Sequence, residues 1–423
     1  MRVLVLSKEA WRDEQNGGNV LSNIFKDFDA EFAQIYCTDN EPNNNICRLY
    51  YQMTDHMMVN NILRSTLVGK VKKYDDVPNS KMVVQERYHA MKKYNLEIVR
   101  TIREIVWKIA DWNNVGLAEF VKNFKPDVVF APCYGSHYMI RLTKIVRKLT
   151  KVPIISYISD DFYTNRQYSF SLLFWMNHFA LRKNIRSVFT LYSLVYTMTD
   201  EQKVQCEKDF QANMKILRKS GLFDINRKKT FVNNPIKIVY GGGIYLNRWK
   251  TLEHLVDSIK SINKDGVKII IDIYTGTELK ERIKHKLNDG INSKLHGIVS
   301  LEELKQIYSH SDIALHVEGF DRKSKLTVRL SFSTKIVDCL DSGCAVMAIC
   351  DEEQAGFSYL KRNNAAICIS NPNEIKKILQ DIIAHPDLII KFQEQAFNLG
   401  RKNHNETLTR QQLFDDFKKI ANL

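Results

Sequence analysis

A lysine and an aspartate stand one helical turn apart in the segment "STKIVDCLDSG" (333–343). Lys335 falls in the first turn of the helix predicted here, where the helix dipole favours a carboxylate over a cation. A bound diphosphate would be attracted both by this lysine and by the helix N-terminus at Ser333 and Thr334. Asp338 lies one turn further on the same face and can accept hydrogen bonds from ribose hydroxyls. An exposed Lys335–Asp338 ion pair is the competing interpretation of this helix taken alone.

Three adjacent glycines end a predicted strand at 236–242, in the segment "YGGGIYLNRWK". Gly242 and Gly243 would let the backbone approach a phosphate closely, with Arg248 and Lys250 adding positive charge where the next helix begins. A tight connection from strand to helix would need the same glycines, so both interpretations stay open. The spacing does not match the dinucleotide-binding fingerprint, and no P-loop motif occurs in the chain, which excludes both of these nucleotide-binding classes.

Further candidates stand directly after predicted strands, where parallel sheets place their ligands. Glu318 can hold a sugar or stabilise positive charge at an anomeric carbon, and a loop cap is the alternative role for it. His137 and the pair Asp160–Asp161 are candidates for positioning an acceptor or a sugar, although a lone histidine is more often structural. The glycines in equivalent places are candidates for nucleotide binding: Gly17, Gly18, Gly276 and Gly297.

Bulk composition describes a folded protein with an acidic counterpart. The chain has 423 residues, 44% of them hydrophobic and 26% charged, so we expect two domains with ordinary cores. The formal net charge of +14 favours nucleic acid, an anionic membrane or a phosphorylated substrate as that counterpart. The basic residues are dispersed and match no nucleic-acid-binding motif, so nucleic acid is the least favoured of the three.

The cysteines and the hydropathy of the chain indicate the cellular compartment in which we expect the protein. The eight cysteines contain no Cys-x-x-Cys pair and mostly lie in apolar runs, which is typical of a reduced cytoplasmic protein without a metal site. The apolar stretch at the N-terminus is too short for a signal peptide, and no run reaches the about 18 residues of a spanning helix. We therefore expect a cytoplasmic protein, with peripheral attachment at the inner face of the cell membrane left open.

Apolar runs of strand length alternate with helical patterns, which predicts parallel sheets covered by helices on both faces. The expected strands are 2–7, 33–37, 127–132, 153–159, 187–193, 236–242, 268–275, 294–299, 313–318, 345–350 and 365–370. The expected helices are 85–124 (one or two, with Tyr88, Met91, Tyr94, Ile98, Ile102 and Ile105 at helical spacing), 250–263, 277–288, 301–309, 334–342, 372–384 and 386–421.

These elements predict an α/β protein of two doubly wound, Rossmann-like domains that face a central cleft. We expect one domain at 1–216, a linker at 217–235 and a second domain at 236–385. The C-terminal helices, 386–423, are expected to return to the first domain.

The segment "STKIVDCLDSGCAVMAI" resembles the nucleotide-sugar-binding signature of two-Rossmann-domain (GT-B type) glycosyltransferases, in particular those of family 4. The matching positions are Lys335, Leu340, Gly343 and Val346. Upstream, "LHGIVSLEELKQIYSHSDIALHVE" is similar to a second stretch of the family through Gly297, Val299, Glu303, Leu304, Tyr308 and Asp312. The glycine turn with Lys250 also resembles the family pattern. Three departures stand out. The second glutamate of the family is replaced by Asp338, twenty positions after Glu318, and a longer loop, 319–332, fills the interval. Arg248 lies late for the family's arginine.

The resemblance implies a retaining glycosyltransferase similar to bacterial enzymes that build capsule, exopolysaccharide or wall polymers. The donor would be a nucleoside-diphosphate sugar bound by the second domain, without a metal ion or a permanently bound cofactor. The acceptor, a glycan or a polyprenyl-linked sugar, would meet the first domain. The implied catalytic residues are Glu318, Lys250, Lys335, Asp161 and His137, and the implied nucleotide-binding residues are Gly17, Gly18, Gly242, Gly243, Arg248, Gly276, Gly297, Ser333, Thr334 and Asp338.

Two segments combine aromatic or aliphatic residues with cations: 168–189, with Arg182, Lys183 and Arg186, and 63–74. Such segments can lie on an anionic membrane surface, where a polyprenyl-linked acceptor would be found. A core helix or a contact in a homo- or hetero-oligomer is the alternative. Two further functions stay open beside the transferase: a non-catalytic, transferase-like subunit that stabilises a partner enzyme, and a nucleotide-sugar epimerase.

Overall fold

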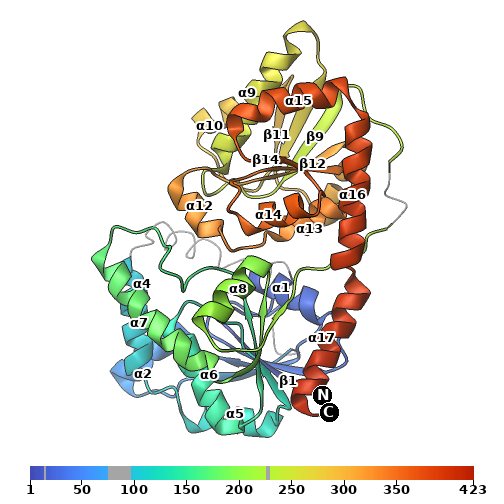
Figure 1. The fold of residues 1–423 in the computed structure, drawn as a ribbon. Coiled ribbons are helices and arrows are strands. Elements are labelled where there is room, and N and C mark those ends of the chain that lie inside the picture. Colours follow the sequence, from blue (N-terminus) through green and yellow to red (C-terminus); the bar gives the residue numbers. More distant parts are fainter. Residues whose placement is uncertain (14–15, 75–96, 225–228) are drawn as a thin grey trace.

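The computed structural model of the chain describes residues 1–13, 16–74, 97–224 and 229–423. It has two α/β domains, each a mainly parallel sheet with helices on both faces, as Figure 1 shows. The predicted fold class is confirmed.

The first sheet has the strand order β4-β3-β2-β1-β5-β6-β7-β8, and β4 is antiparallel to β3. Its central strands are nearly continuous apolar runs because helices cover both faces. The strands are β1 (Arg2–Ser7), β2 (Glu31–Tyr36), β3 (Leu49–Gln52), β4 (Lys70–Lys73), β5 (Val128–Phe130), β6 (Ile154–Ile158), β7 (Tyr192–Thr197) and β8 (Met214–Ile216). The helices are α1 (Asn16–Phe25), α2 (Asp55–Arg64), α4 (Glu97–Ile109), α5 (Val115–Phe124), α6 (His137–Thr150), α7 (Leu172–Phe189) and α8 (Asp200–Asp209).

The second sheet is parallel throughout its described strands, in the order β11-β10-β9-β12-β13-β14. Its strands are β9 (Ile236–Gly241), β10 (Ile269–Tyr274), β11 (Ser293–His296), β12 (Ile313–Val317), β13 (Ala345–Ile349) and β14 (Ile367–Ile369). Its helices are α9 (Arg248–Ile262), α10 (Glu281–Leu287), α11 (Leu301–Ser309), α12 (Arg322–Val328), α13 (Thr334–Leu340), α14 (Ala355–Arg362) and α15 (Ile375–Ala384).

Both sheets reverse their winding direction at a central strand, between β1 and β5 in the first and between β9 and β12 in the second. Doubly wound sheets form a crevice at such a switch point, beyond the carboxyl ends of the strands. The loops that leave β1, β5, β9 and β12 are therefore the ones that can build a site.

The last two helices join the domains. α16 (Asp387–Asn403) runs along the second domain, whereas α17 (Glu406–Ala421) lies against the first, as Figure 1 shows. Phe417 of α17 packs against Phe25 and Phe28, and Asp416 accepts a hydrogen bond from the Tyr196 hydroxyl at 2.7 Å. The C-terminus thus contributes to the core of the first domain.

All but one of the expected strands lie at or close to strands of the structure. The expected strand 187–193 is wrong, because 187–189 end α7 and the strand begins at Tyr192. Three strands, β3, β4 and β8, were not expected, and α12 occupies the interval 319–332 that was interpreted as a loop. Of the expected helix 85–124, Ile98, Ile102 and Ile105 lie on α4, whereas Tyr88, Met91 and Tyr94 lie outside the described residues.

Candidate active site

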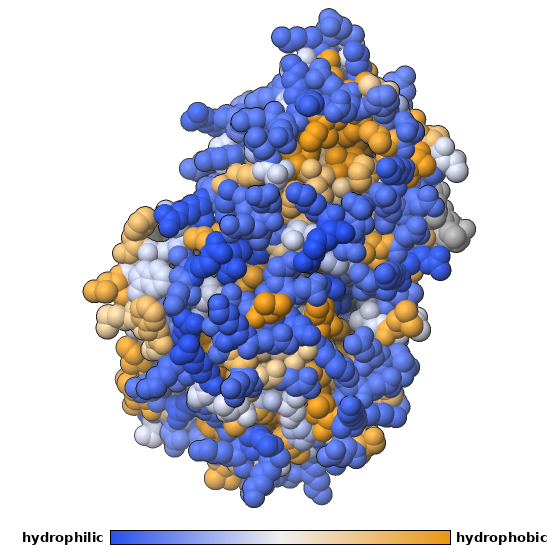
Figure 2. Space-filling view, viewed as in Figure 1, coloured by the Kyte–Doolittle hydropathy of each residue, from blue (hydrophilic) through white to orange (hydrophobic). Residues whose placement is uncertain are grey.

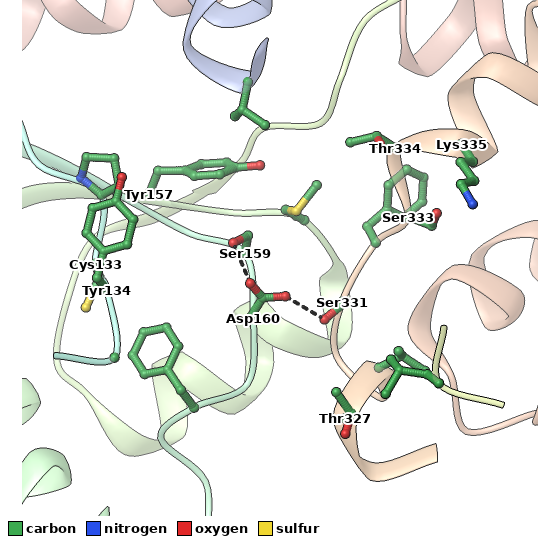
Figure 3. Close-up of a pocket in the computed structure, with 18 of the residues that line it drawn as sticks. Cys133, Tyr134, Tyr157, Ser159, Asp160, Thr327, Ser331, Ser333, Thr334 and Lys335 are labelled. Carbon is green, nitrogen blue, oxygen red and sulfur yellow. Dashed lines mark hydrogen bonds between the residues drawn. The ribbon is translucent and has the colours of Figure 1, made fainter. Parts of the chain in front are cut away.

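A pocket of about 480 Å³ opens between the two domains, at the switch points of both sheets. One side, which we call the charged wall, comes from the second domain: Arg248, Glu318, Ser333, Thr334 and Lys335. The opposite side, the apolar wall, comes from the first domain: Ile24, Phe130, Tyr157, Phe162 and Met198. Figure 3 shows Tyr157 and Lys335 on opposite sides of this pocket.

Lys335 is the unusual cation of the charged wall. α13 begins at Thr334 with Ser333 as its N-cap, which places Lys335 in the first turn, beside the loop after β9. Its Nζ donates to the Tyr240 hydroxyl at 3.3 Å and lies 5.1 Å from the centre of the Tyr240 ring. Within the described part of the chain no carboxylate forms an ion pair with it. Burial, together with the nearby Arg248 charge, lowers the pKa of Lys335 to about 8.

Gly242 makes room for this ammonium group. Its φ of +146° lies in a region that side-chain-bearing residues rarely adopt. A Cβ atom at this position would stand 1.9 Å from Lys335 Nζ. The glycine turn after β9 therefore holds open the space that Lys335 occupies.

Arg248 and Glu318 form a buried bidentate ion pair in the same wall. The guanidinium Nε donates to Glu318 Oε2 at 2.8 Å and the second nitrogen, Nη2, donates to Oε1 at 2.7 Å. The side chains are only 6% and 2% exposed. A buried carboxylate held by two charge-assisted hydrogen bonds is fixed in position. Glu318 is thus a rigid anchor for Arg248 rather than a freely available carboxylate.

A buried histidine lies beneath this pair. His316 Nε2 is 4.0 Å from Glu318 Oε1, and burial plus the neighbouring cations lower the pKa of His316 to about 3. The imidazole is therefore neutral at physiological pH. The positive charge of the wall comes from Arg248, which Glu318 balances, and from Lys335.

Other predicted residues lie elsewhere. Lys250 is exposed on α9, with its Nζ 5.6 Å from the Trp249 ring centre, and does not line the pocket. Asp338 pairs with Lys219, which follows β8, instead of Lys335. Gly276 and Gly297 lie in the loops after β10 and β11, outside the residues that line the pocket. Gly17 and Gly18 lie in the first turn of α1, whose Val20, Leu21 and Ile24 reach the pocket.

Gly243 contributes through its backbone carbonyl. The carbonyl oxygen accepts from the Tyr240 hydroxyl at 2.7 Å and from Arg248 Nη1 at 3.3 Å. This glycine therefore orients two side chains of the second domain.

His137 and Asp161 line a second pocket of about 400 Å³ between α4, α6 and α7. It shares Tyr134, Asp160 and Phe162 with the first pocket, so the two spaces adjoin. The His137 Nδ1 atom lies 2.7 Å from the Asn184 side-chain nitrogen.

Asp161 is fully engaged in a contact between the domains. It accepts from the Thr164 amide and hydroxyl, and its Oδ2 lies 2.9 Å from Nη2 of Arg329, which precedes α13. In this arrangement Asp161 fixes the orientation of the two domains at the edge of the pocket.

Two pocket residues were not singled out from the sequence. Gln354, the N-cap of α14, is buried and lines the pocket, and its Oε1 atom has no hydrogen-bond partner within the described residues. Tyr157 is the last but one residue of β6 and points into the space between the walls (Figure 3). Both follow the rule that ligands meet the carboxyl ends of strands, which is the signal that would have found them.

No group of His, Cys, Asp or Glu side chains in the described ranges is arranged to hold a metal ion. None of the helices formed by the described residues is long and apolar enough to cross a membrane.

Scans against known protein families and against curated proteins found no match to the chain. Solved structures do resemble it over its full length. One is Anabaena Alr3699/HepE in complex with UDP and glucose, with a TM-score of 0.61 at 12% identity, covering 99% of this chain and 100% of that one.

Sucrose-phosphate synthase from Thermosynechococcus elongatus aligns with a TM-score of 0.63 at 10% identity, over 100% and 99% of the two chains. An α,α-trehalose-phosphate synthase (UDP-forming) from Burkholderia vietnamiensis aligns with a TM-score of 0.57 at 8% identity, covering 100% of this chain and 98% of that one. At these identities the likeness shows the fold alone: the chain has the two-domain GT-B fold of these structures.

Proposed function

We propose that the chain is a retaining glycosyltransferase that moves a hexose from a nucleoside-diphosphate sugar to a glycan or lipid-linked acceptor in surface polysaccharide synthesis. The observation that carries this proposal is Lys335, a partly buried cation without an ion-pair partner among the described residues, which faces a pocket between two Rossmann-like domains. An unbalanced, partly desolvated cation is costly unless an anion joins it. A donor diphosphate supplies that anion.

The charged wall provides the groups that such a donor needs. Lys335 would pair with the diphosphate, and Ser333 and Thr334 line the pocket beside it. Because Arg248 is held by Glu318 and the Gly243 carbonyl, its remaining N–H groups and its charge would act from a fixed place. Preorganised charge of this kind stabilises a transition state without further rearrangement.

The transfer step would break the bond between the anomeric carbon and the diphosphate oxygen. Its electron pair stays on the leaving diphosphate, whose growing negative charge Lys335 stabilises. The acceptor oxygen bonds to the anomeric carbon on the same face, and its proton passes to the leaving diphosphate oxygen. Of the carboxylates lining the pocket, Glu318 is bound to Arg248 and Asp160 accepts from Ser331 at 3.1 Å, which favours this direct route over a covalent intermediate on the protein.

The solved structures support a uridine nucleotide as the first donor to test, because their names mention UDP, glucose and a UDP-forming reaction. The experiment is to incubate the chain with UDP-, GDP- and ADP-hexoses and to measure release of the nucleoside diphosphate, with and without added glycan acceptors. The anomeric configuration of the product is read by NMR. Release by the wild type, and its loss in Lys335→Met but not in Lys264→Met, is the expected result. Lys264 is a suitable control because it is exposed in the same domain.

A second function is a non-catalytic subunit that stabilises a partner transferase. It is favoured by one observation: Glu318 is fully occupied by Arg248 and is 2% exposed. Nucleotide binding without turnover of any donor, in the presence of a broad set of acceptors, would support this second function over the first.

A further inference from the structure

Helix α4 has its apolar side turned toward solvent. Thr101 and Glu104 line the 400 Å³ pocket between α4, α6 and α7, which we call the chamber. The next stripe around the helix consists of Ile98, Ile102 and Ile105, which are 57%, 55% and 49% exposed. Residues three and four apart share one helix face, so this is a continuous apolar stripe. A helix of a water-exposed protein normally turns such a stripe inward.

Helix α7 repeats the arrangement next to α4. Asn177 and His178 line the chamber, and Asn177 donates to the Thr101 hydroxyl of α4 at 2.8 Å. On its outer side Leu172, Met176 and Phe179 are exposed, Met176 by 61%. Figure 2 shows apolar side chains along the edge of the domain where Figure 1 places α4 and α7. We call these two exposed stripes together the outer face.

The chamber behind the outer face is polar and incompletely satisfied. Ser136 and His178 are 6% and 5% exposed, and Ser136 Oγ and His178 Nε2 have no hydrogen-bond partner within the described residues. Buried polar groups in proteins are normally paired, so unpaired ones lining a cavity indicate a polar ligand. The chamber also adjoins the main pocket through Tyr134, Asp160 and Phe162. A headgroup bound in it would therefore lie beside the donor.

The charges beside the outer face indicate which kind of partner it can bind. α7 carries the exposed cations Lys183 and Arg186 and no carboxylate, whereas its third cation, Arg182, pairs with Asp209. On α4, Glu97 pairs with Arg100, and Glu104 accepts from two backbone amides at the start of α6. In a symmetric dimer the outer face would meet its own copy, with like charges opposed. An anionic membrane satisfies both the apolar stripes and the cations.

We propose that the outer face docks on an anionic membrane surface and that the chamber receives the polar headgroup of a lipid-linked acceptor. The acceptor would then be an amphiphile whose sugar reaches the donor from the membrane side, in place of a free glycan. This inference rests on the proposed transferase function for the acceptor's role, whereas docking itself is measured independently of turnover.

The test is flotation of the full chain with vesicles of phosphatidylcholine mixed with phosphatidylglycerol, and of phosphatidylcholine alone, at physiological salt. The face variant carries Ile102→Glu and Met176→Glu. The control variant carries Leu408→Glu and Val204→Glu, at positions on α17 and α8 that are 65% and 66% exposed. Circular dichroism and thermal melting establish that all proteins are folded.

The wild type and the control variant are expected to float with the anionic vesicles. The partitioning of the face variant onto these vesicles should be at least about tenfold weaker. Wild type that fails to float, or a face variant that floats equally, overturns the proposal. A wild-type dimer that the face variant dissolves, seen by sedimentation without vesicle binding, overturns it in favour of a second copy. UDP binding is measured on the same samples: loss of flotation with intact UDP binding defeats only this inference, whereas absence of nucleotide binding in the wild type defeats the donor site.

Discussion

The two walls of the pocket differ in how they are stabilised and in what they can recognise. The charged wall has a bidentate ion pair between Arg248 and Glu318 that is almost fully buried, and beside it Lys335 without a carboxylate partner in the described ranges. The apolar wall has aromatic and aliphatic side chains, and Tyr157 adds a hydroxyl; Ser159 and Asp160 of the same domain line the pocket beside it (Figure 3). The first wall is preorganised for one kind of anion; the second offers shape and contact area.

Under the proposed function, this difference would place the donor at the charged wall and the acceptor at the apolar wall. Fixed charges act most strongly on a ligand whose charge grows during the reaction, as that of a leaving diphosphate does. Apolar and aromatic surfaces instead accept the carbon faces of sugars and differ little in energy between related ligands. Donor binding should therefore depend sharply on single residues of the charged wall, and acceptor use should depend weakly on single residues of the apolar wall.

The largest expected effect is that of Glu318→Ala on stability. The variant leaves the Arg248 charge buried and uncompensated, so the free energy of unfolding should fall by about 3–5 kcal/mol in urea denaturation. Glu353→Ala is the matched control: its pair with Arg166 also joins two side chains, but these are 62% and 56% exposed, and the loss should stay below about 1 kcal/mol. Equal losses in the two variants would contradict a buried, preorganised pair.

The next effect is that of Lys335→Met on nucleotide binding. Removing one charge-assisted contact should weaken UDP binding by about 10- to 100-fold in calorimetry. The free energy of unfolding should not fall, because this lysine has no ion pair among the described residues and its charge is partly desolvated. Lys264→Met serves as the control and should leave both quantities unchanged. A destabilised Lys335→Met protein with normal UDP affinity would show that the lysine is structural.

The charged wall should also respond to pH. Since the pKa of Lys335 is lowered from 10.5 to about 8, the ammonium form is present below pH 8 and is lost above it. UDP affinity should fall above pH 8, by at most about tenfold per pH unit. The stability of the free protein should change in the opposite sense: it should rise between pH 8 and pH 10.5, where the unfolded chain binds the extra proton.

The variant Lys335→Arg tests whether deprotonation of Lys335 causes the fall in UDP affinity above pH 8. A guanidinium remains protonated throughout this range, so the variant should bind UDP without the fall in affinity above pH 8. A fall of equal size in the arginine variant would assign the pH dependence to another group.

The smallest effect is expected on the apolar wall. Tyr157→Phe keeps the ring and removes the hydroxyl, so UDP affinity should change less than twofold while the turnover of acceptor falls about 2- to 12-fold, as for one neutral hydrogen bond. Acceptor-dependent release of nucleoside diphosphate measures this. A tenfold loss of UDP affinity in Tyr157→Phe would show that donor binding depends on the apolar wall as well as on the charged wall, which contradicts the proposed difference between them.

The sequence predicted the parallel sheets because both faces of such strands are buried and the apolar runs are nearly continuous. The prediction of secondary structure failed where the local residue pattern favours one element and the packing in the folded protein produces another. β4 reads "KVKK", an edge strand with a single apolar residue, Val71, and so has no apolar run to recognise. The end of α7 reads "SVF", which is β-prone by composition but is held in the helix by its neighbours.

The sequence could predict which residues line the candidate site only where the course of the backbone places them there. Gly242 directly follows β9, and Lys335 lies in the first turn of α13, the helix that leads into β13; both face the switch point between β9 and β12. The pairing of Arg248 with Glu318 and of Asp338 with Lys219 joins residues 70 and 119 positions apart. Helical spacing placed Asp338 near Lys335, but it could not show that Lys219 would pair with the carboxylate.

The central claim is that the charged wall binds the diphosphate of a sugar donor. The most direct test is a thermal-shift measurement of the wild type and of Lys335→Met with UDP, GDP, ADP and CMP. A ligand that binds only the folded state raises the melting temperature by mass action. We expect at least one nucleoside diphosphate to raise the melting temperature of the wild type, and this rise to be lost or much reduced in Lys335→Met. A wild type that responds to none of them, or a variant that responds as strongly, would contradict it.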